Sequence, residues 1–380
     1  MRQLSSFIFS SDRKKPARVS TALFLGAWVA IGLVVIDTFI NVVFSYPSDP
    51  KVLNPSQLQS YFDYGRSQEE KLRRMTRPDK TQTAPITLAG WYEPLEIVEP
   101  ARNSNSKIVT FYGMSHAVNL AHALARVSDR YVPRIVGGPG ATANWAYGAY
   151  LRDHGGGSSR AVVLAIMSGN LAMINTLSAM TWNTDFAMPY TADRFLLDDG
   201  DLKVVHPPYT TFDQYVQTFY NDKKWSEAIR VFAEHDSMYD AFIVRASILD
   251  HSAFFRLLRR AYAQRIIREA RHAVLDHTGY NPNSNEIKVA QRIVEEFSIR
   301  ARGDGMIPII FVVNLFGDSD YLFQALRPAL EHDNIPYLNS ATIASPSDPR
   351  KYLRDSHFTP EIDDEMARAL IKVIEQASRQ

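Results

Sequence analysis

The sequence contains no cysteine among its 380 residues. This absence excludes thiol nucleophiles, thiolate metal sites and disulfides. It leaves the compartment open, because a chain of this length can bury a core that needs no disulfide. No two of the ten histidines stand in a His-x-x-x-His pair. The sequence therefore predicts no metal site and no cofactor.

The sequence also lacks a charge excess of either sign. Its 42 basic and 41 acidic residues give a net charge of +1, and no basic stripe with interleaved aromatic residues occurs. We therefore expect no nucleic-acid partner. No internal repeat or low-complexity tract is present. The apolar content of 46% is typical of a folded protein with one large domain or two modest ones.

One long apolar run stands near the N-terminus, at residues 21–44. At about 1.5 Å per residue it reaches roughly 36 Å, enough to cross a hydrocarbon core of about 30 Å. A cleaved signal peptide is disfavoured, because the run is long and no small-x-small site follows. Excess positive charge on the preceding side predicts a cytoplasmic N-terminus and an outside location for the rest. The basic residues on that side are Arg2, Arg13, Lys14, Lys15 and Arg18.

An acidic residue, Asp37, interrupts this run. A carboxylate at the bilayer centre costs about 2.5–3.5 kcal/mol and less near an interface. Two interpretations remain open. Asp37 is a tolerated acid near the outer end of a single-pass anchor, or Asp37 and Asn41 make a contact with a partner inside the membrane.

The remainder of the chain predicts an α/β fold with a three-layer α/β/α parallel sheet of flavodoxin-like type. We expect a cytoplasmic tail at 1–20, an anchor at 21–44, a juxtamembrane stalk at 45–106 and the α/β domain at 107–380. Apolar segments alternate with helical patterns, as in a parallel sheet with crossover helices. The predicted strands are 108–112, 133–136, 161–167, 306–313 and 336–338, and the predicted helices are 117–127, 143–153, 320–332 and 361–377.

A large helical insertion is expected at about 180–300, where this alternation stops. Residues 240–275 have the pattern of one long helix, whose arginines include Arg256, Arg259, Arg260, Arg265, Arg268 and Arg271. This basic helix could lie on anionic lipid or bind an anionic polymer. The alternative is a solvated face whose arginines pair with acids elsewhere. In either case the insertion is large enough to cap a site on the sheet.

Polar groups suited to acyl transfer follow the predicted strands. Ser115 comes after a strand that stops at Gly113 and opens a helix, where backbone N–H groups converge. The next two strands end at Gly137-Gly-Pro-Gly140 and at Ser168-Gly169-Asn170. Because ligands bind beyond the carboxyl ends of parallel strands, these groups are expected at one edge of the sheet.

An acid and a base follow the last strand, at Asp355 and His357. Ser115 is our candidate nucleophile, His357 its base and Asp355 the acid that orients the imidazole. Residues so close in sequence can face one serine only if they lie in a loop. The alternatives are a helix N-cap for Ser115, a cap on the final helix for His357 and an ordinary loop acid for Asp355. His116 is expected to point away from Ser115, with substrate contact as a minor possibility.

The order of these blocks resembles the SGNH, or GDSL-type, hydrolase superfamily over about 107–178 and 306–378. The resemblance implies that Gly140, with Gly138 as the fallback, and Asn170 form the oxyanion hole. Three departures stand out: Met114 replaces the usual aspartate, Gly169-Asn170-Leu171 is a shortened block, and the acid and base are separated by one residue. The last feature is closer to periplasmic polysaccharide O-acetyltransferases and acetylesterases. A Gly-x-Ser-x-Gly elbow of α/β-hydrolases is rejected, because here the serine closes the first strand.

The resemblance and the apolar run together imply a serine esterase or O-acyltransferase in the bacterial inner membrane. Its domain would be periplasmic, and its substrate an acetylated glycan or another acyl ester. Polysaccharide-assembly proteins are further possible partners. The alternative is a non-catalytic SGNH-like module that binds glycan or serves as a scaffold in such an assembly.

Overall fold

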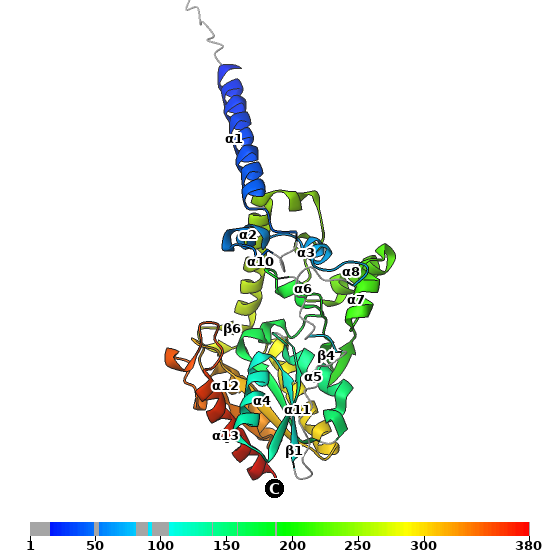
Figure 1. Ribbon diagram of the computed structural model, residues 1–380, viewed down its shortest axis with the longest axis vertical. Helices are drawn as coiled ribbons and strands as arrows, with labels where there is room; N and C mark the ends of the chain where they lie inside the picture. Colours follow the sequence, from blue (N-terminus) through cyan, green and yellow to red (C-terminus); the bar gives the residue numbers. More distant parts are fainter. Residues whose placement is uncertain are drawn as a thin grey trace, which may run out of the picture.

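The structure is a computed structural model that describes residues 16–48, 53–80, 90–92, 106–138, 140–157, 159–186 and 188–379. Most of the predicted cytoplasmic tail lies outside the described residues. This part includes four of the basic residues that precede the apolar run: Arg2, Arg13, Lys14 and Lys15. In Figure 1 the chain forms an α/β domain, a helical region above it and a single projecting helix.

A five-stranded parallel sheet forms the centre of the α/β domain, in the order β2-β1-β3-β8-β9. All five predicted strands are present, and the fold-class prediction is confirmed. The sheet interior reads as continuous apolar runs because both faces are covered. The strands are β1 (Lys107–Gly113), β2 (Tyr131–Gly137), β3 (Ser159–Met167), β8 (Ile307–Val313) and β9 (Tyr337–Asn339).

Helices cover both faces of this sheet. Helices α4 and α13 pack together on one face, and α5, α11 and α12 pack on the other. α11 lies within the range predicted as insertion, yet its apolar side is part of the sheet core. Pro360 begins α13 as predicted. The helices are α4 (Ser115–Val127), α5 (Ala143–Asp153), α11 (Asn285–Gly303), α12 (Tyr321–His332) and α13 (Pro360–Ala377).

The strand order reverses direction between β1 and β3, where two crossovers lie on opposite faces of the sheet. β1 is followed by α4 on one face, and β2 is followed by α5 on the other. This is the topological switch point of a flavodoxin-like sheet, beyond the carboxyl ends of β1 and β3. Ser115 follows β1 and Asn170 follows β3, so both lie at this switch point.

Helices of the stalk and the insertion form a second layer between the sheet and α1. We call this layer the cap. Leu72 and Trp91 from the stalk pack with Tyr215, Phe219 and other side chains of the insertion in a core separate from that of the sheet. The cap contains α2 (Gln57–Asp63), α3 (Gln68–Met75), α6 (Ala179–Trp182), α7 (Phe212–Phe219), α8 (Asp222–His235), α9 (Ala241–Val244), the 3₁₀ turn η3 (Ile248–His251) and α10 (Ala253–Val274).

Short segments connect these layers. The hairpin of β4 and β5 packs on α11, and β6 and β7 pair beside α12. The open end of the second pair also reaches the sheet, because the Tyr280 hydroxyl donates to the carbonyl of Ser168, which follows β3. These segments are β4 (Arg194–Asp198), β5 (Asp201–Val205), β6 (Leu275–Asp276), β7 (Gly279–Tyr280), η1 (His154–Gly157), η2 (Ser168–Met173), η4 (Ser340–Thr342) and η5 (Pro349–Lys351).

The long basic helix begins later than predicted. The sequence predicted one helix from 240 to 275, whereas α10 begins at Ala253 after the short elements α9 and η3. The reason is local capping: the side chains of Asp240 and Ser252 each accept from backbone N–H groups and start separate helices.

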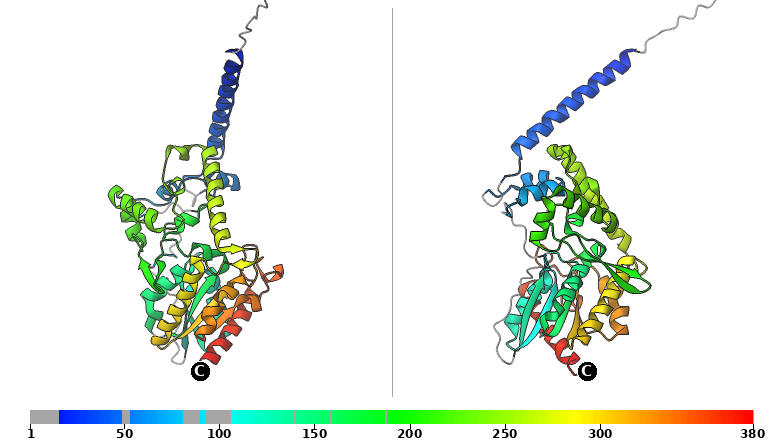
Figure 2. Two further views of the ribbon diagram at one scale, coloured as in Figure 1. Left: turned by 180° about the vertical axis from the view of Figure 1, so that it is seen from behind. Right: turned by 90° about the vertical axis from the view of Figure 1, so that its right-hand side faces the viewer.

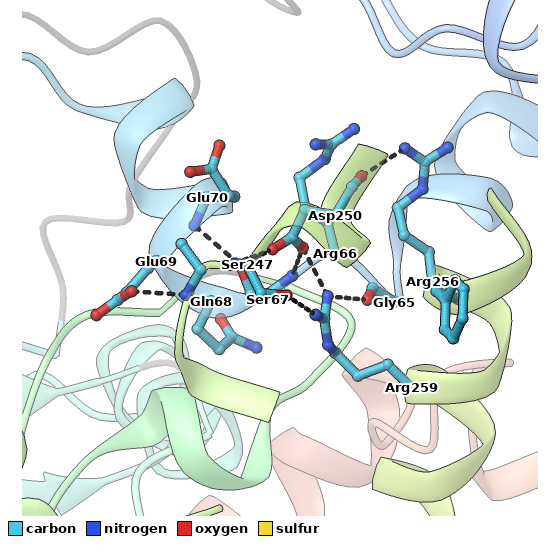
Figure 3. A network of polar contacts seen from close by, with 12 residues as sticks. Gly65, Arg66, Ser67, Gln68, Glu69, Glu70, Ser247, Asp250, Arg256 and Arg259 are labelled. Carbon is cyan, nitrogen blue, oxygen red and sulfur yellow. Dashed lines mark hydrogen bonds and ion pairs between the residues drawn. The ribbon is translucent and has the colours of Figure 1, made fainter. Parts of the chain in front are cut away.

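Two of the arginines of α10 face inward and hold the stalk. Arg259 donates to Asp250 at 2.6 Å and to the carbonyl of Gly65 at 3.1 Å. Arg256 donates to the carbonyl of Phe62 at 2.7 Å. The arginines therefore do not form one uniformly solvated face. Figure 3 shows this network between the stalk and the insertion.

The carboxylate of Asp250 is the centre of the network in Figure 3. It accepts from the backbone N–H of Ser67 at 2.6 Å, from that of Ser247 at 2.9 Å and from Arg259. Burial alone raises its pKa, but the hydrogen bonds from Ser67 and Ser247 and the charge of Arg259 lower it on balance. The ionised form is thus the one that the cap stabilises.

The projecting helix α1 (Pro16–Val43) carries exposed apolar side chains over Thr21–Val43. Within the described residues it is the one helix long and apolar enough to cross a membrane. Such a helix is consistent with a single anchor or a signal sequence. In Figure 2 its lower end lies beside the start of α10.

Asp37 of α1 makes a contact within its own chain. One of its carboxylate oxygens accepts from the hydroxyl of Ser252 at 3.0 Å and from the N–H of Phe254 at 2.9 Å. Asn41 accepts from Arg256 at 2.8 Å. The partner of Asp37 and Asn41 in this structure is therefore α10.

Candidate functional site

Glycine at position 113 lets the chain turn directly from β1 into α4. Its φ of +154° lies in a region that L-residues rarely adopt. A Cβ at this position would also lie 2.7 Å from the Cβ of Ala165 and 3.3 Å from that of Ala117. The turn brings Ser115 to the first position of α4, with its side chain half-buried.

Ser115, His357 and Asp355 form one hydrogen-bonded chain. Ser115 Oγ lies 2.7 Å from His357 Nε2, and His357 Nδ1 lies 2.9 Å from an oxygen of Asp355. A carboxylate only accepts, so Nδ1 carries the proton and donates to it. Nε2 is then free to accept from the serine hydroxyl. This is the tautomer that a general base requires.

A tight loop aligns the acid and the base. Tyr352 and Phe358 form an isolated antiparallel bridge at its base. The N–H of Ser356 donates to the carbonyl of Leu353 at 3.0 Å, and the N–H of Leu353 donates to that of His357 at 2.7 Å. Because the chain turns here and is not helical, the Asp355 carboxylate reaches Nδ1 of His357 while Nε2 of the same ring reaches Ser115. The predicted loop is confirmed.

Asp355 is an exposed acid. Its side chain is 67% exposed, and the backbone N–H of His357 also donates to it at 3.3 Å. The hydrogen bond from the His357 side chain lowers the pKa of Asp355. Water screens a carboxylate in this position, so its effect on the imidazole is smaller than that of a buried acid.

His116 lies beneath the base and not against the nucleophile. It is 3% exposed, and its ring stacks on that of His357 with centroids 4.6 Å apart and planes 18° apart. Its Nε2 lies 3.2 Å from the carbonyl of Ser356, so this nitrogen donates. Such burial leaves no surface for the substrate contact considered from the sequence. The geometry gives His116 a positioning role instead.

Ser356 is the residue that His116 holds. Its φ of +67° is unusual for a residue other than glycine and costs free energy unless surrounding contacts fix it. The hydrogen bond from His116 is one such contact. The stacked ring and this bond together fix the loop that carries His357.

Burial lowers the pKa of His116 from 6.5 to about 4. A base with a lowered pKa stabilises the fold fully above pH 6.5, and this contribution is lost as the pH falls toward 4. We expect the wild type to lose about 3 kcal/mol more unfolding free energy between pH 7 and pH 4 than a His116→Phe variant, which keeps a ring but cannot titrate. Urea unfolding at both pH values measures this difference. Equal pH dependence of the two proteins would contradict the buried neutral state.

The proposed oxyanion donors form a second pair. The amide nitrogen of Asn170 donates to the carbonyl of Gly140 at 2.8 Å, which fixes the end of β3 against the turn after β2. The N–H of Gly138 donates to the carbonyl of Gly113 at 3.0 Å. Gly138 is therefore occupied within the fold, and Gly140 is the better candidate. Pro139, between them, lies outside the described residues.

The structure does not join this pair to the triad by a hydrogen bond within the described residues. Both sets lie at the carboxyl edge of the sheet, because each residue follows a strand that ends there. A small pocket lies beside Gly140, with walls that include Trp145, Trp182 and Tyr190. Its volume of about 10 Å³ is close to the least that can hold one water, and Ser115, His357 and Asn170 do not line it.

No family model and no curated protein matches this chain. The comparisons therefore leave the SGNH resemblance as a hypothesis. The structure shows the parallel α/β sheet and the contact between Ser115 and His357 at its carboxyl edge.

Two of the structural alternatives are wrong. The N-cap of α4 is Met114 and not Ser115, and α13 is preceded by Thr359 as its N-cap and not by His357. Met114 is 1% exposed in the sheet core, so the residue that departs from the SGNH pattern serves packing. No group of three or more His, Asp or Glu side chains placed to hold a metal occurs in the part of the chain that the structure describes.

Sequence reasoning missed the positioning role of His116 and the strained Ser356. The sequence shows that His116 is next to Ser115. It does not show the contact with Ser356, which lies 240 positions away along the chain. Nothing in the local sequence indicates that contact.

Proposed function

We propose that this protein is a serine-dependent acyl-transfer enzyme, either an esterase or an O-acyltransferase, of SGNH type. The observation that carries the proposal is the hydrogen-bonded chain from Ser115 through His357 to Asp355. A serine hydroxyl is a poor nucleophile at neutral pH, and a base at 2.7 Å in the correct tautomer is what activates it.

The reaction would follow from the roles of these groups. Ser115 Oγ attacks the ester carbonyl while its proton moves to His357 Nε2. The leaving alcohol takes this proton from the imidazolium as the carbon–oxygen bond breaks, and an acyl-serine remains. Water or a sugar hydroxyl then attacks the acyl carbon while His357 takes its proton. The bond from this carbon to Ser115 Oγ breaks, and the serine oxygen recovers the proton from the imidazolium. The first acceptor gives hydrolysis and the second gives transfer.

Negative charge develops on the carbonyl oxygen during both attacks. The amide of Asn170, the N–H of Gly140 and the first N–H groups of α4 are the donors proposed to stabilise it. The acetyl group and the glycan substrate are part of the proposal through the SGNH resemblance.

We place the enzyme in the bacterial inner membrane, with α1 as a retained single-pass anchor and the α/β domain outside. The hydrogen bonds from Ser252 and Phe254 to Asp37 support this, because they make α1 part of the folded protein. A removable signal sequence does not need such contacts. They also provide partners for a carboxylate that would otherwise be costly near the membrane.

A fluorophosphonate probe tests the proposal directly, because it forms a stable adduct only with an activated serine. We expect the full-length protein to be labelled at Ser115, as identified by peptide mass mapping, and Ser115→Ala to remain unlabelled. The matched control Ser347→Ala removes an exposed serine and should label like the wild type. A wild type without adduct would contradict the enzyme and favour the non-catalytic glycan-binding or scaffold module.

A further inference from the structure

An open apolar groove lies where α1 meets the start of α10. Its volume is about 690 Å³. The hydrogen bonds from Ser252 and Phe254 to Asp37 join the two helices at its base. Its walls are mostly aliphatic and aromatic: Leu33, Val34, Phe254, Phe255, Leu257 and Leu258.

Large apolar side chains at the start of α10 and in the turn η3 before it are exposed. Ile248 in η3 is 84% exposed, Leu258 in α10 is 61% exposed and Phe255 is 43% exposed. We call these three residues the elbow, because they lie where η3 turns into α10. A soluble surface rarely exposes such a cluster without a partner.

The contact with α1 sets the level of the elbow relative to a membrane that α1 crosses. Asp37 stands six residues before Val43, the end of the helix, which corresponds to about 9 Å along its axis. Because the N-terminus of α10 is hydrogen-bonded to Asp37, the start of α10 is held beside the last two turns of the apolar helix. A membrane crossed by residues 21–43 therefore reaches this level.

The exposed surface of α10 changes from apolar to basic as the helix leaves α1. The exposed side of its first turns is apolar and ends at Tyr262, a residue type enriched at membrane interfaces. The exposed basic residues come after it: Arg265, which pairs with Glu269, then Arg268 and Arg271. Apolar groups followed by cations match the order of acyl chains and anionic headgroups.

We propose that the elbow inserts into the outer interfacial layer of the bilayer and that lipid acyl chains fill the groove between α1 and α10. The protein then contacts the membrane at two points, α1 and the elbow. Two contacts fix the orientation of the domain, whereas one helix with an exposed linker would leave it free to rotate. The occupant is lipid, since the groove is continuous with the lipid-facing surface of α1.

This orientation also sets the height of the candidate site. α10 has 22 residues and a length of about 33 Å. It runs from the elbow to β6, and β7 then contacts the carbonyl of Ser168 at the edge of the sheet. The elbow thus holds the carboxyl edge of the sheet at a defined distance from the lipid.

The inference rests on the proposed anchoring by α1 but not on the chemistry at Ser115. The absence of cysteine allows single-cysteine variants without a background to remove. We would label Ile248→Cys and Leu258→Cys with an environment-sensitive NBD fluorophore in full-length protein reconstituted in vesicles of zwitterionic and anionic lipid. Val29→Cys, in the centre of α1, and His332→Cys, with a side chain 80% exposed at the end of α12, are the controls.

We expect nitroxide-labelled lipid to quench the probes at 248 and 258 as it quenches the probe at 29, and to spare the probe at 332. Iodide in the water should quench the probe at 332 and spare the probes at 248, 258 and 29. If the probe at 29 is quenched but those at 248 and 258 match 332, the elbow does not insert. If the probe at 29 is not quenched, the anchoring itself fails. If the shielding from iodide disappears as the protein is diluted in lipid, the groove is covered by a second copy of the chain and not by lipid.

Discussion

Replacing Ser115 or His357 with alanine is expected to lower the turnover of a soluble acetyl ester on the order of 10⁴–10⁶-fold. The physical reason is that the two groups act as one unit across a 2.7 Å hydrogen bond. Without the serine no acyl-enzyme forms, and without the imidazole the hydroxyl keeps its proton. p-Nitrophenyl acetate hydrolysis by the full-length protein in detergent measures the effect, with Ser347→Ala as the matched control.

The other members of the site should give a graded series in the same assay. Asn170→Ala should cost about 10²–10³-fold in turnover if its amide stabilises the oxyanion. Asp355→Asn should cost less than the roughly 10⁴-fold typical of a buried triad acid, because Asp355 is two-thirds exposed. A Ser115→Ala variant as active as the wild type would contradict the nucleophile.

Replacing Asp250 with alanine is expected to destabilise the cap by about 3–5 kcal/mol. The cause is the guanidinium of Arg259, which is 2% exposed and would lose the carboxylate that neutralises it. The N–H groups of Ser67 and Ser247 would lose their acceptor as well. Urea unfolding and hydrogen exchange of the stalk and η3 measure the loss.

Two further variants separate the unpaired charge from other effects. Asp250→Leu combined with Arg259→Met removes both charges and should recover part of the stability. Glu269→Gln breaks the exposed pair with Arg265 and should change little, since water screens that pair. An Asp250→Ala variant as stable as Glu269→Gln would contradict the structural role of the buried pair.

The sheet could be predicted because its signals are local. Each strand is an apolar run bounded by polar or glycine residues, and each helix has its own periodicity, so five strands and four helices were identified from residues close in sequence. The proximity of Ser115 to His357 and Asp355 also followed, because the carboxyl ends of parallel strands meet at one edge. That rule brings together residues 242 positions apart.

The cap and the anchor contact could not be predicted in the same way. The arginines of α10 form a basic helix in sequence, but two of them are buried by stalk residues roughly 190 positions earlier. The capping side chains Asp240 and Ser252 divide the predicted helix, and their effect competes with a continuous helical periodicity. His116 points away from Ser115 as expected, but its contact with Ser356 in a distant loop could not be predicted, for a similar reason.

The sequence by itself determined the absence of thiol chemistry, the apolar N-terminal helix, the parallel α/β architecture and the candidate residues at its strand ends. All of these depend on composition or on patterns within a few residues. Only the tertiary structure decided that Ser115, His357 and Asp355 form one hydrogen-bonded chain, that His116 supports it from below, and that Asp37 joins α1 to α10. Those outcomes depend on distances between segments that chain folding alone brings together, and no local pattern encodes them.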